Sequence, residues 1–168
     1  MENIKNIDLE LVLNIQHFAR KKNALTGYFV GHYNPTENTG TATLELAKWI
    51  HTVEDDSDEE TEDEGFYDGD GTPETDIVSV KKVYQFEGYM DHDDPGMKFI
   101  ADLEFKTGDE RKIWFKQVRT DGTTLEGRAT VSDIIVSGGE AVEYAAFECK
   151  IGWDSAPTIT PATDPLAG

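Results

Sequence analysis

The residues best suited to chemistry are carboxylates, and one group of them forms the motif Asp68-Gly69-Asp70-Gly71. Carboxylates at alternate positions of a loop can converge on one calcium ion. If Asp68 and Asp70 are the third and fifth positions of such a loop, however, the first is Phe66 and the twelfth is Ile77. Neither of those side chains can coordinate a metal. The spacing therefore predicts an acidic turn in an exposed loop, with Asp68 and Asp70 as weak candidates for adventitious calcium binding.

A second group, Asp91-His92-Asp93-Asp94, places one imidazole among three carboxylates. Consecutive side chains point in different directions, so this spacing is poor for a metal centre. Pro95 follows directly, and an aspartate before a proline is typical of the start of a helix. We therefore expect Asp93 or Asp94 to be a helix N-cap.

The familiar signatures of catalysis are missing from the sequence. The histidines stand in four unrelated contexts, and neither a nucleophile elbow nor a His-Glu-x-x-His zinc motif occurs. Cys149, the single cysteine, alternates with Phe147 and Ile151 on the apolar side of an expected strand, which favours a role in the core. One cysteine also excludes an intrachain disulfide and a cysteine-rich zinc site. We predict no enzyme activity, no cofactor and no metal site.

The chain carries a net charge of −19, and the charge is concentrated in one segment. Residues 54–76 contain 13 acidic residues and no basic ones, which leaves −6 for the remainder of the 168 residues. An acidic surface repels nucleic acid, because phosphate binding requires clustered Lys and Arg. A run of about 18 apolar residues is absent and the first eight residues are polar, so no membrane span or signal peptide is expected and a cytoplasmic site of synthesis is favoured.

The hydrophobic pattern predicts a mainly β chain that forms one domain over residues 1–168. The fold class expected is a β-sandwich or rolled barrel of about seven strands with one flanking α-helix. Alternation of apolar residues is clearest in 77–89, where Val78, Val80, Tyr84 and Phe86 should share one face. Further strands are expected at 24–30, 41–53, 111–118, 125–136 and 142–153, and the helix at 95–105. Residues 9–18 fit a strand or a helix equally well.

Two segments should lie outside this core. Residues 54–76 repel one another too strongly to be buried, so we expect an exposed, mobile acidic loop anchored by Phe66 and Tyr67. Residues 155–168 contain three prolines and should form an extended, unpaired tail.

Several of these segments, read together, resemble the siphophage major tail proteins, the subunits of the tail tube. The resemblance is carried by residues 127–134 (GRATVSDI), 138–144 (GGEAVEY), 147–151 (FECKI) and Pro157, which look like the closing strands of that family. The helix after Asp93-Asp94-Pro95 and the strand at Trp49-Ile50 that leads into the acidic segment also look similar. The match covers residues 24–157 and is closest to phages of Gram-positive hosts.

The resemblance implies a structural virion protein whose copies form hexameric rings, and rings that stack into an acidic conduit for DNA ejection. It implies self-association and contacts with tape measure, tail terminator and distal tail proteins, with assembly in the host cytoplasm. DNA would pass without specific binding, and no membrane would be involved. The residues expected to make contacts between subunits or rings are Glu54, Asp55, Asp56, Asp58, Glu59, Glu60, Phe66, Tyr67, Arg20, Lys21, Lys22, Lys81 and Lys82.

Other functions remain open on the sequence alone. The chain could be a monomeric β-sandwich module that binds a carbohydrate or a receptor, with calcium at the acidic loop. It could also be a tail terminator or head–tail connector that stops at one ring. A hydrolase that uses paired carboxylates has no support from the spacing.

Overall fold

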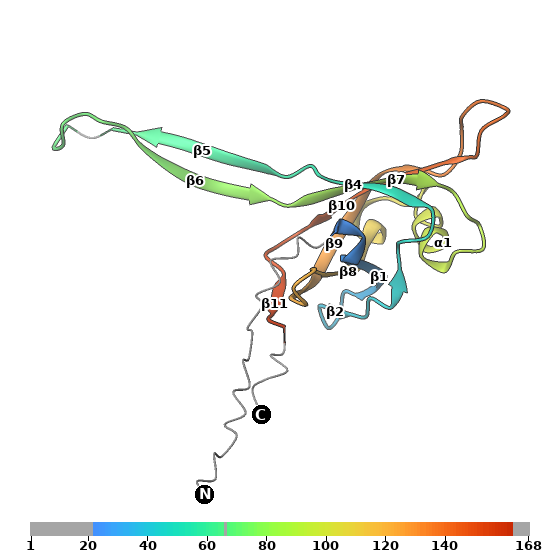
Figure 1. Ribbon diagram of the computed structural model, residues 1–168. Helices are drawn as coiled ribbons and strands as arrows, with labels where there is room; N and C mark the ends of the chain where they lie inside the picture. Colours follow the sequence, from blue (N-terminus) through green and yellow to red (C-terminus); the bar gives the residue numbers. More distant parts are fainter. Residues whose placement is uncertain (1–21, 66, 163–168) are drawn as a thin grey trace, which may run out of the picture.

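The computed structural model describes residues 22–65 and 67–162, which form one curled antiparallel sheet, a long hairpin and a single short α-helix (Figure 1). The strands are β1 Gly27–Asn34, β2 Thr39–Gly40, β3 Leu44–Glu45, β4 Ile50–Asp55, β5 Asp58–Glu64, β6 Glu74–Lys81, β7 Val83–Tyr89, β8 Lys112–Val118, β9 Thr124–Ile135, β10 Ala146–Trp153 and β11 Thr158–Thr160. The helix is α1 Pro95–Ala101, and two 3₁₀ turns span Asn23–Leu25 and Gly108–Arg111.

The main sheet has the strand order β2-β1-β8-β9-β10-β7-β4, with β3 paired to β1 and β11 paired to β9. All of its pairings are antiparallel, and the sheet curls into a half-barrel. The mainly β fold with one helix is therefore confirmed, in the rolled form that the sequence allowed.

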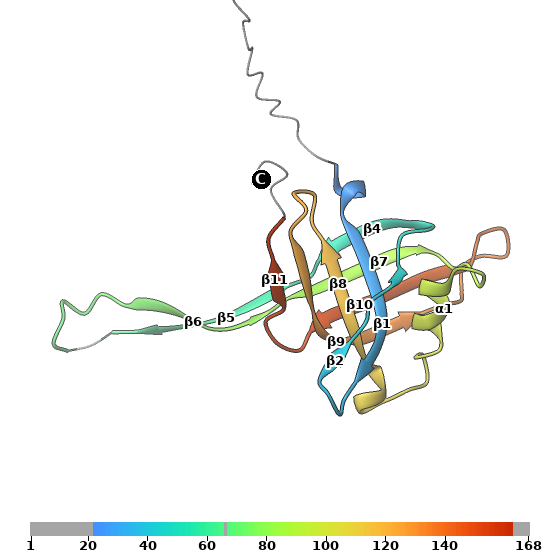
Figure 2. The same cartoon turned by 90° about the horizontal axis from the view of Figure 1, so that it is seen from below.

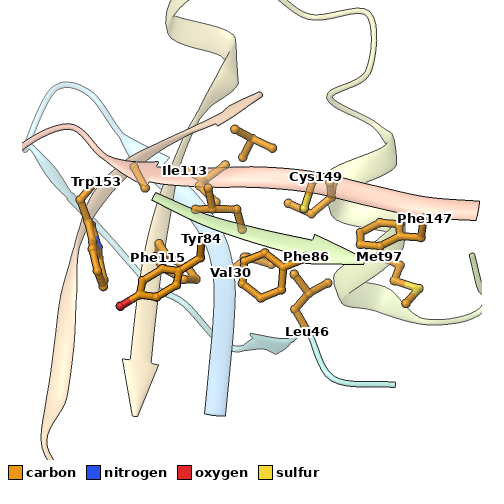
Figure 3. Close-up of a cluster of buried hydrophobic side chains, with 14 of the residues drawn as sticks. Val30, Leu46, Tyr84, Phe86, Met97, Ile113, Phe115, Phe147, Cys149 and Trp153 are labelled. Carbon is orange, nitrogen blue, oxygen red and sulfur yellow. The ribbon is translucent and has the colours of Figure 1, made fainter. Parts of the chain in front are cut away.

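The core lies on the inner face of the curl, where inward residues alternate along β8, β9 and β10 (Figure 3). Phe115, Val131 and Cys149 are buried there, and α1 adds Met97 and Ile100 to the same cluster. Asp94 caps α1, because its carboxylate accepts a hydrogen bond from the backbone N–H of Met97 at 2.9 Å. The N-cap role and the core position of Cys149 are both confirmed.

Two expected elements differ from what the sequence indicated, one in length and one in continuity. The helix was expected over 95–105, but α1 ends at Ala101 and tightens into i→i+3 turns, with Leu103 N–H donating to the carbonyl of Ile100 at 3.0 Å. The strand expected at 41–53 is divided into β3 and β4 by a turn in which Trp49 has a φ of +60°.

The tail was expected to be extended and unpaired, and the second part of that prediction is wrong for residues 158–160. Strand β11 pairs with the first residues of β9, with Ile159 opposite Leu125. Residues 161 and 162 follow it, and 163–168 lie outside the described residues, as do residues 9–18. The Thr-Ile-Thr run has the β-branched residues that favour a strand despite the surrounding prolines.

Candidate functional site

The most distinctive feature of the molecule is a hairpin of β5 and β6 that projects away from the body, which we call the arm (Figures 1 and 2). It continues the hairpin of β4 and β7 beyond the edge of the main sheet. The segment 54–76 was expected to be a loop, and this is corrected by the seven cross-strand pairs from Asp58↔Lys81 to Glu64↔Glu74. The β-branched run of β6 supplies a regular partner strand, so the acidic residues adopt an extended, paired conformation.

The run 77–89 therefore is not one strand with one buried face. Lys82 interrupts it, and the two halves have different surroundings. Tyr84 and Phe86 in β7 are buried in the core, whereas Val78 and Val80 in β6 are 51% and 62% exposed. The reason is that β7 lies between β4 and β10 in the sheet, whereas β6 pairs with β5 alone.

The two strands of the arm differ in chemistry. Six of the seven residues of β5 are acidic, and charges of this density protect an open strand edge from pairing with another chain. Strand β6 instead exposes the apolar side chains of Ile77, Val78 and Val80, and no other described strand pairs with its open edge. The arm therefore has one edge that repels a further strand and one that can accept it.

The outer half of the arm also places like charges opposite one another. Glu62 faces Asp76 and Glu64 faces Glu74 in the strand register. Like charges at directly opposed positions destabilise a strand pair. Nearby, Thr75 Oγ1 donates to the carboxylate of Asp63 at 2.6 Å, which supports the pairing on the other face. In the free subunit, backbone hydrogen bonds therefore stabilise the arm, while repulsion between opposed carboxylates destabilises it.

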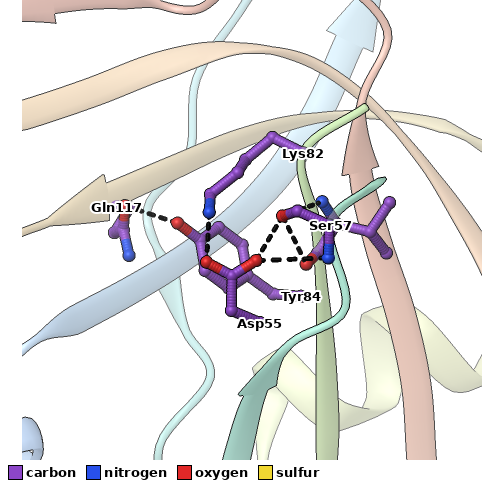
Figure 4. A network of polar contacts seen from close by, with 6 residues as sticks. Asp55, Ser57, Lys82, Tyr84 and Gln117 are labelled. Carbon is purple, nitrogen blue, oxygen red and sulfur yellow. Dashed lines mark hydrogen bonds and ion pairs between the residues drawn. The ribbon is translucent and has the colours of Figure 1, made fainter. Parts of the chain in front are cut away.

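The base of the arm is fixed by a polar network at the junction with the body (Figure 4). Lys82 forms an ion pair with Asp55, and the hydroxyl of Ser57 donates to the same carboxylate. Ser57 Oγ also accepts the backbone N–H of Val83 at 3.2 Å. Partial burial by itself would raise the pKa of Asp55, but the hydrogen bonds from Lys82 and Ser57 outweigh that effect and lower it.

A second ion pair ties the same junction to β10. Lys150 Nζ lies 2.7 Å from a carboxylate oxygen of Asp56, and this hydrogen bond raises the pKa of Lys150. Asp55, Asp56 and Lys82 were all expected to make contacts between subunits. In this chain they pair internally, where they set the direction in which the arm leaves the body.

The other expected contact residues are spread along the arm or lie elsewhere. Asp58, Glu59 and Glu60 are exposed on β5, Lys81 is exposed at the end of β6, and Tyr67 at the tip is fully exposed. Glu54 is exposed in β4, and Lys22 precedes the first 3₁₀ turn. Arg20, Lys21 and Phe66 lie outside the described residues.

Beside the base of the arm lies a groove of about 1100 Å³, lined by residues of β6, β10 and β11. Its walls include Val80 and Lys81 from the arm, Ile159 from β11, and Arg119 from the turn after β8. Trp153 also lines it, and the indole Nε1 of Trp153 is the one buried side-chain nitrogen or oxygen in the described chain without a hydrogen-bond partner. We call this feature the splay groove.

An exposed aromatic patch, which the sequence did not reveal, lies on the body away from the arm. Trp49 and Tyr144 are 60% and 79% exposed, and the rings of Tyr89 and Tyr144 lie 5.7 Å apart. Trp49 Nε1 donates to Asp91 at 3.2 Å, and Lys48 Nζ lies 2.6 Å from the same carboxylate. Apolar residues scattered in loops and at a strand end have no periodicity that would have identified this patch.

Asp68 and Asp70, the weak candidates for calcium binding, belong to no group of metal ligands among the described residues. The Thr72 side chain donates a hydrogen bond to Asp70, and the backbone N–H of Thr72 donates a second at 2.9 Å; both lower the pKa of Asp70. Across residues 22–65 and 67–162, His, Cys, Asp and Glu side chains form no group of three or more placed to hold a metal ion. No helix among these same residues is long and apolar enough to cross a bilayer.

Comparison with known proteins finds solved structures with a similar fold but no sequence family that matches. Neither a protein-family model nor a curated protein matches the sequence. Solved structures with a similar fold include the tail of an empty gene transfer agent particle with C6 symmetry (TM-score 0.59, 13% identity) and the virion of a native gene transfer agent (0.60, 12%), each covering 84% of this chain and 99% of the other. The anti-feeding prophage cap, a tube terminating cap, matches at 0.51 and 11% identity, over 90% of this chain and 100% of that one. At such identities the likeness establishes a shared fold.

Proposed function

We propose that this chain is a structural subunit of a phage-like tail tube. Copies close into hexameric rings, and the rings stack into a conduit through which DNA leaves the particle. The fold supports the proposal, because it is shared with chains from a gene transfer agent tail that has C6 symmetry and from a gene transfer agent virion. The residues that resemble siphophage major tail proteins point in the same direction.

The single observation that carries the proposal is the arm. A two-stranded hairpin is marginally stable alone in water, and this one adds opposed carboxylates and exposes Ile77, Val78 and Val80. No other described strand pairs with its edges. Such an element gains most of its stabilisation from another molecule, and a copy of the same chain can supply that contact in every ring.

The charge of the chain suits a conduit. With a net charge of −19, each subunit repels the phosphate backbone, so DNA can slide through the lumen without adhering to it. In the assembled particle we expect the tape measure protein inside the tube and tail terminator and distal tail proteins at its ends. Subunits would be made in the host cytoplasm, and the sequence resemblance favours a long-tailed phage of a Gram-positive host.

Negative-stain imaging of the purified chain over a range of concentrations tests the proposal. We expect long tubes of uniform width whose end views show six-fold symmetry. Small dispersed particles at every concentration would contradict it and would favour a monomeric binding module. That alternative would show itself by thermal stabilisation with a glycan or with calcium.

A tube terminator is the second candidate, and the shared fold of the anti-feeding prophage cap supports it. A terminator closes into one ring and does not stack further. In the same images, single rings that persist at high protein concentration would favour this role over the tube subunit.

A further inference from the structure

We propose that the splay groove is the docking site for the outer half of the arm of a second copy, so that each arm is received at the base of the next one. This inference rests on the proposed function, because it identifies where on the neighbouring subunit the arm binds. It goes further by naming the two surfaces that meet and the groups that pair.

The groove is shaped to take an extended chain. It opens where the sheet divides, between the open edge of β6 and the outer edge of β11, and has a volume of about 1100 Å³. Val80 and Ile159, on its two walls, are 62% and 60% exposed. Each of these edges carries backbone groups that no other described strand pairs. A strand that enters can therefore pair with one edge and cover apolar side chains on both walls.

Among the described residues, the charged groups of the groove that have no partner are two cations, Lys81 and Arg119, and one carboxylate, Asp58. The side chains of Lys81 and Arg119 form no hydrogen bond or ion pair with any of these residues, and both are exposed on the groove walls. Trp153 also lines the groove, but its indole N–H, which has no hydrogen-bond partner among the described residues, is buried beneath the surface. The other cations of the groove, Lys82 and Lys150, are already paired with Asp55 and Asp56.

The unpaired groups of the outer arm are acceptors. Glu62, Glu64, Glu74 and Asp76 form two directly opposed like-charge pairs and contact no cation in the described chain. An arm that inserts its outer half into the groove of another copy brings these carboxylates to Lys81 and Arg119. The contact weakens the repulsion within the arm and supplies carboxylates to Lys81 and Arg119 at the same time.

Intermolecular cross-linking locates the contact directly. Glu64→Cys marks the outer arm and Ile159→Cys marks the groove, while the native Cys149 is buried and does not compete. The two variants, each with one exposed cysteine, are mixed, assembled and treated with a short bismaleimide, so a product that joins one variant to the other can only form between copies. Val142→Cys, on a residue that is 91% exposed in a different loop, replaces Ile159→Cys as the matched control.

We expect tubes in which Glu64→Cys cross-links to Ile159→Cys and not to Val142→Cys. Tubes that form normally but lack the product between Glu64→Cys and Ile159→Cys, whether or not the control position cross-links, would overturn the docking site and leave the proposed function standing. A chain that never assembles would overturn both.

Charge reversal tests the pairing itself. Lys81→Glu with Arg119→Glu should raise the critical concentration for assembly by about tenfold or more, because like charges then meet at the contact. Adding Glu62→Lys and Glu64→Lys should restore assembly. Lys98→Glu, an exposed lysine on α1, is the matched control and should change assembly little. Unfolding curves verify that each variant folds, and a defect that the arm reversals leave unrescued would argue against the pairing.

Discussion

Individual carboxylates in this acidic chain have distinct structural duties. Asp94 accepts the N–H of Met97 at the start of α1, whereas Asp55 holds Lys82 and Ser57 at the base of the arm. Both side chains are common types at ordinary spacings. Their roles come from what surrounds them, a free helix N-terminus in one case and a converging pair of strands in the other.

The cap should be measurable by substitution. Asp94→Ala removes the acceptor for Met97 N–H and should lower the free energy of unfolding by about 1 kcal/mol. Asp93→Ala, one residue earlier, removes a carboxylate without a capping bond and should change stability by less than about 0.5 kcal/mol. Urea unfolding of the two variants decides the matter, and equal losses would contradict the assignment of the cap to Asp94.

The ion pair at the base of the arm should make stability depend on pH. Because the folded state lowers the pKa of Asp55 below its ordinary value of 3.8, its contribution is present above that value. It is lost as the pH falls through the lowered pKa of the folded state. Asp55→Asn should therefore be less stable than the wild type at about pH 6, and the difference should shrink in acid. A difference that stays constant or grows as the pH falls would contradict this sign.

At the scale of elements, periodicity identified which residues of a strand share a side but not what lies over that side. Strands β8 and β9 lie where alternation predicted them, and Phe147, Cys149 and Ile151 point inward as expected. The strand expected at 142–153 begins only at Ala146, and Val142 is 91% exposed in the loop before it. In 77–89 the same alternation continues through Lys82 although the burial ends there. Burial depends on how many neighbours a strand has, and that number is set by distant segments.

The candidate site was predictable to a similar extent. Charge density alone located the projecting segment and identified Asp58, Glu59 and Glu60 as exposed. Tyr67 was expected to anchor the segment, and this is wrong, because its side chain is fully exposed at the tip. It could not show that Asp55 and Lys82 pair within one chain, because 27 positions separate them. The splay groove joins residues from β6, β10, β11 and the turn after β8, so no local pattern contains it.

The junction of β4 with β7 gives an element-scale prediction. A Cβ atom at Gly88 would lie 2.3 Å from the carbonyl oxygen of Trp49, so the strands could not keep their present spacing. Gly88→Ala should cost about 3 kcal/mol of unfolding free energy. At Gly65, near the end of the arm, the nearest atom would be 3.5 Å away, so Gly65→Ala should be nearly neutral. Thermal unfolding of both variants provides the comparison.

The arm should exchange amide hydrogens quickly in the free subunit and slowly after assembly. Opposed carboxylates weaken its outer half, and a neighbouring subunit would supply counter-charges and cover β6. Hydrogen exchange followed by mass spectrometry, on peptides from residues 54–81 in both states, measures the difference. Peptides from β8 serve as the internal reference, since this strand lies inside the sheet in either state. Equally fast exchange of the arm in both states would exclude a role in assembly.

For the molecule as a whole, the net charge of −19 determines how it meets nucleic acid. The cations that the fold brings together are mostly paired internally, as Lys150 is with Asp56 and Arg128 with Asp154. Fluorescence anisotropy with labelled duplex DNA should therefore detect no binding by the free subunit, even at about 50 mM salt, where phosphate contacts are strongest. Saturable binding under those conditions would contradict a non-adhesive conduit.

Because the two strands of the arm differ in chemistry, they also impose a direction on assembly. A further polypeptide can approach along the flank that bears Ile77 and Val80, while the carboxylates of the opposite flank turn it away. Successive molecules that use this contact must all join from the same side. Because every contact is head-to-tail, the resulting assembly has two different ends. Its growth can therefore be started at one end and stopped at the other.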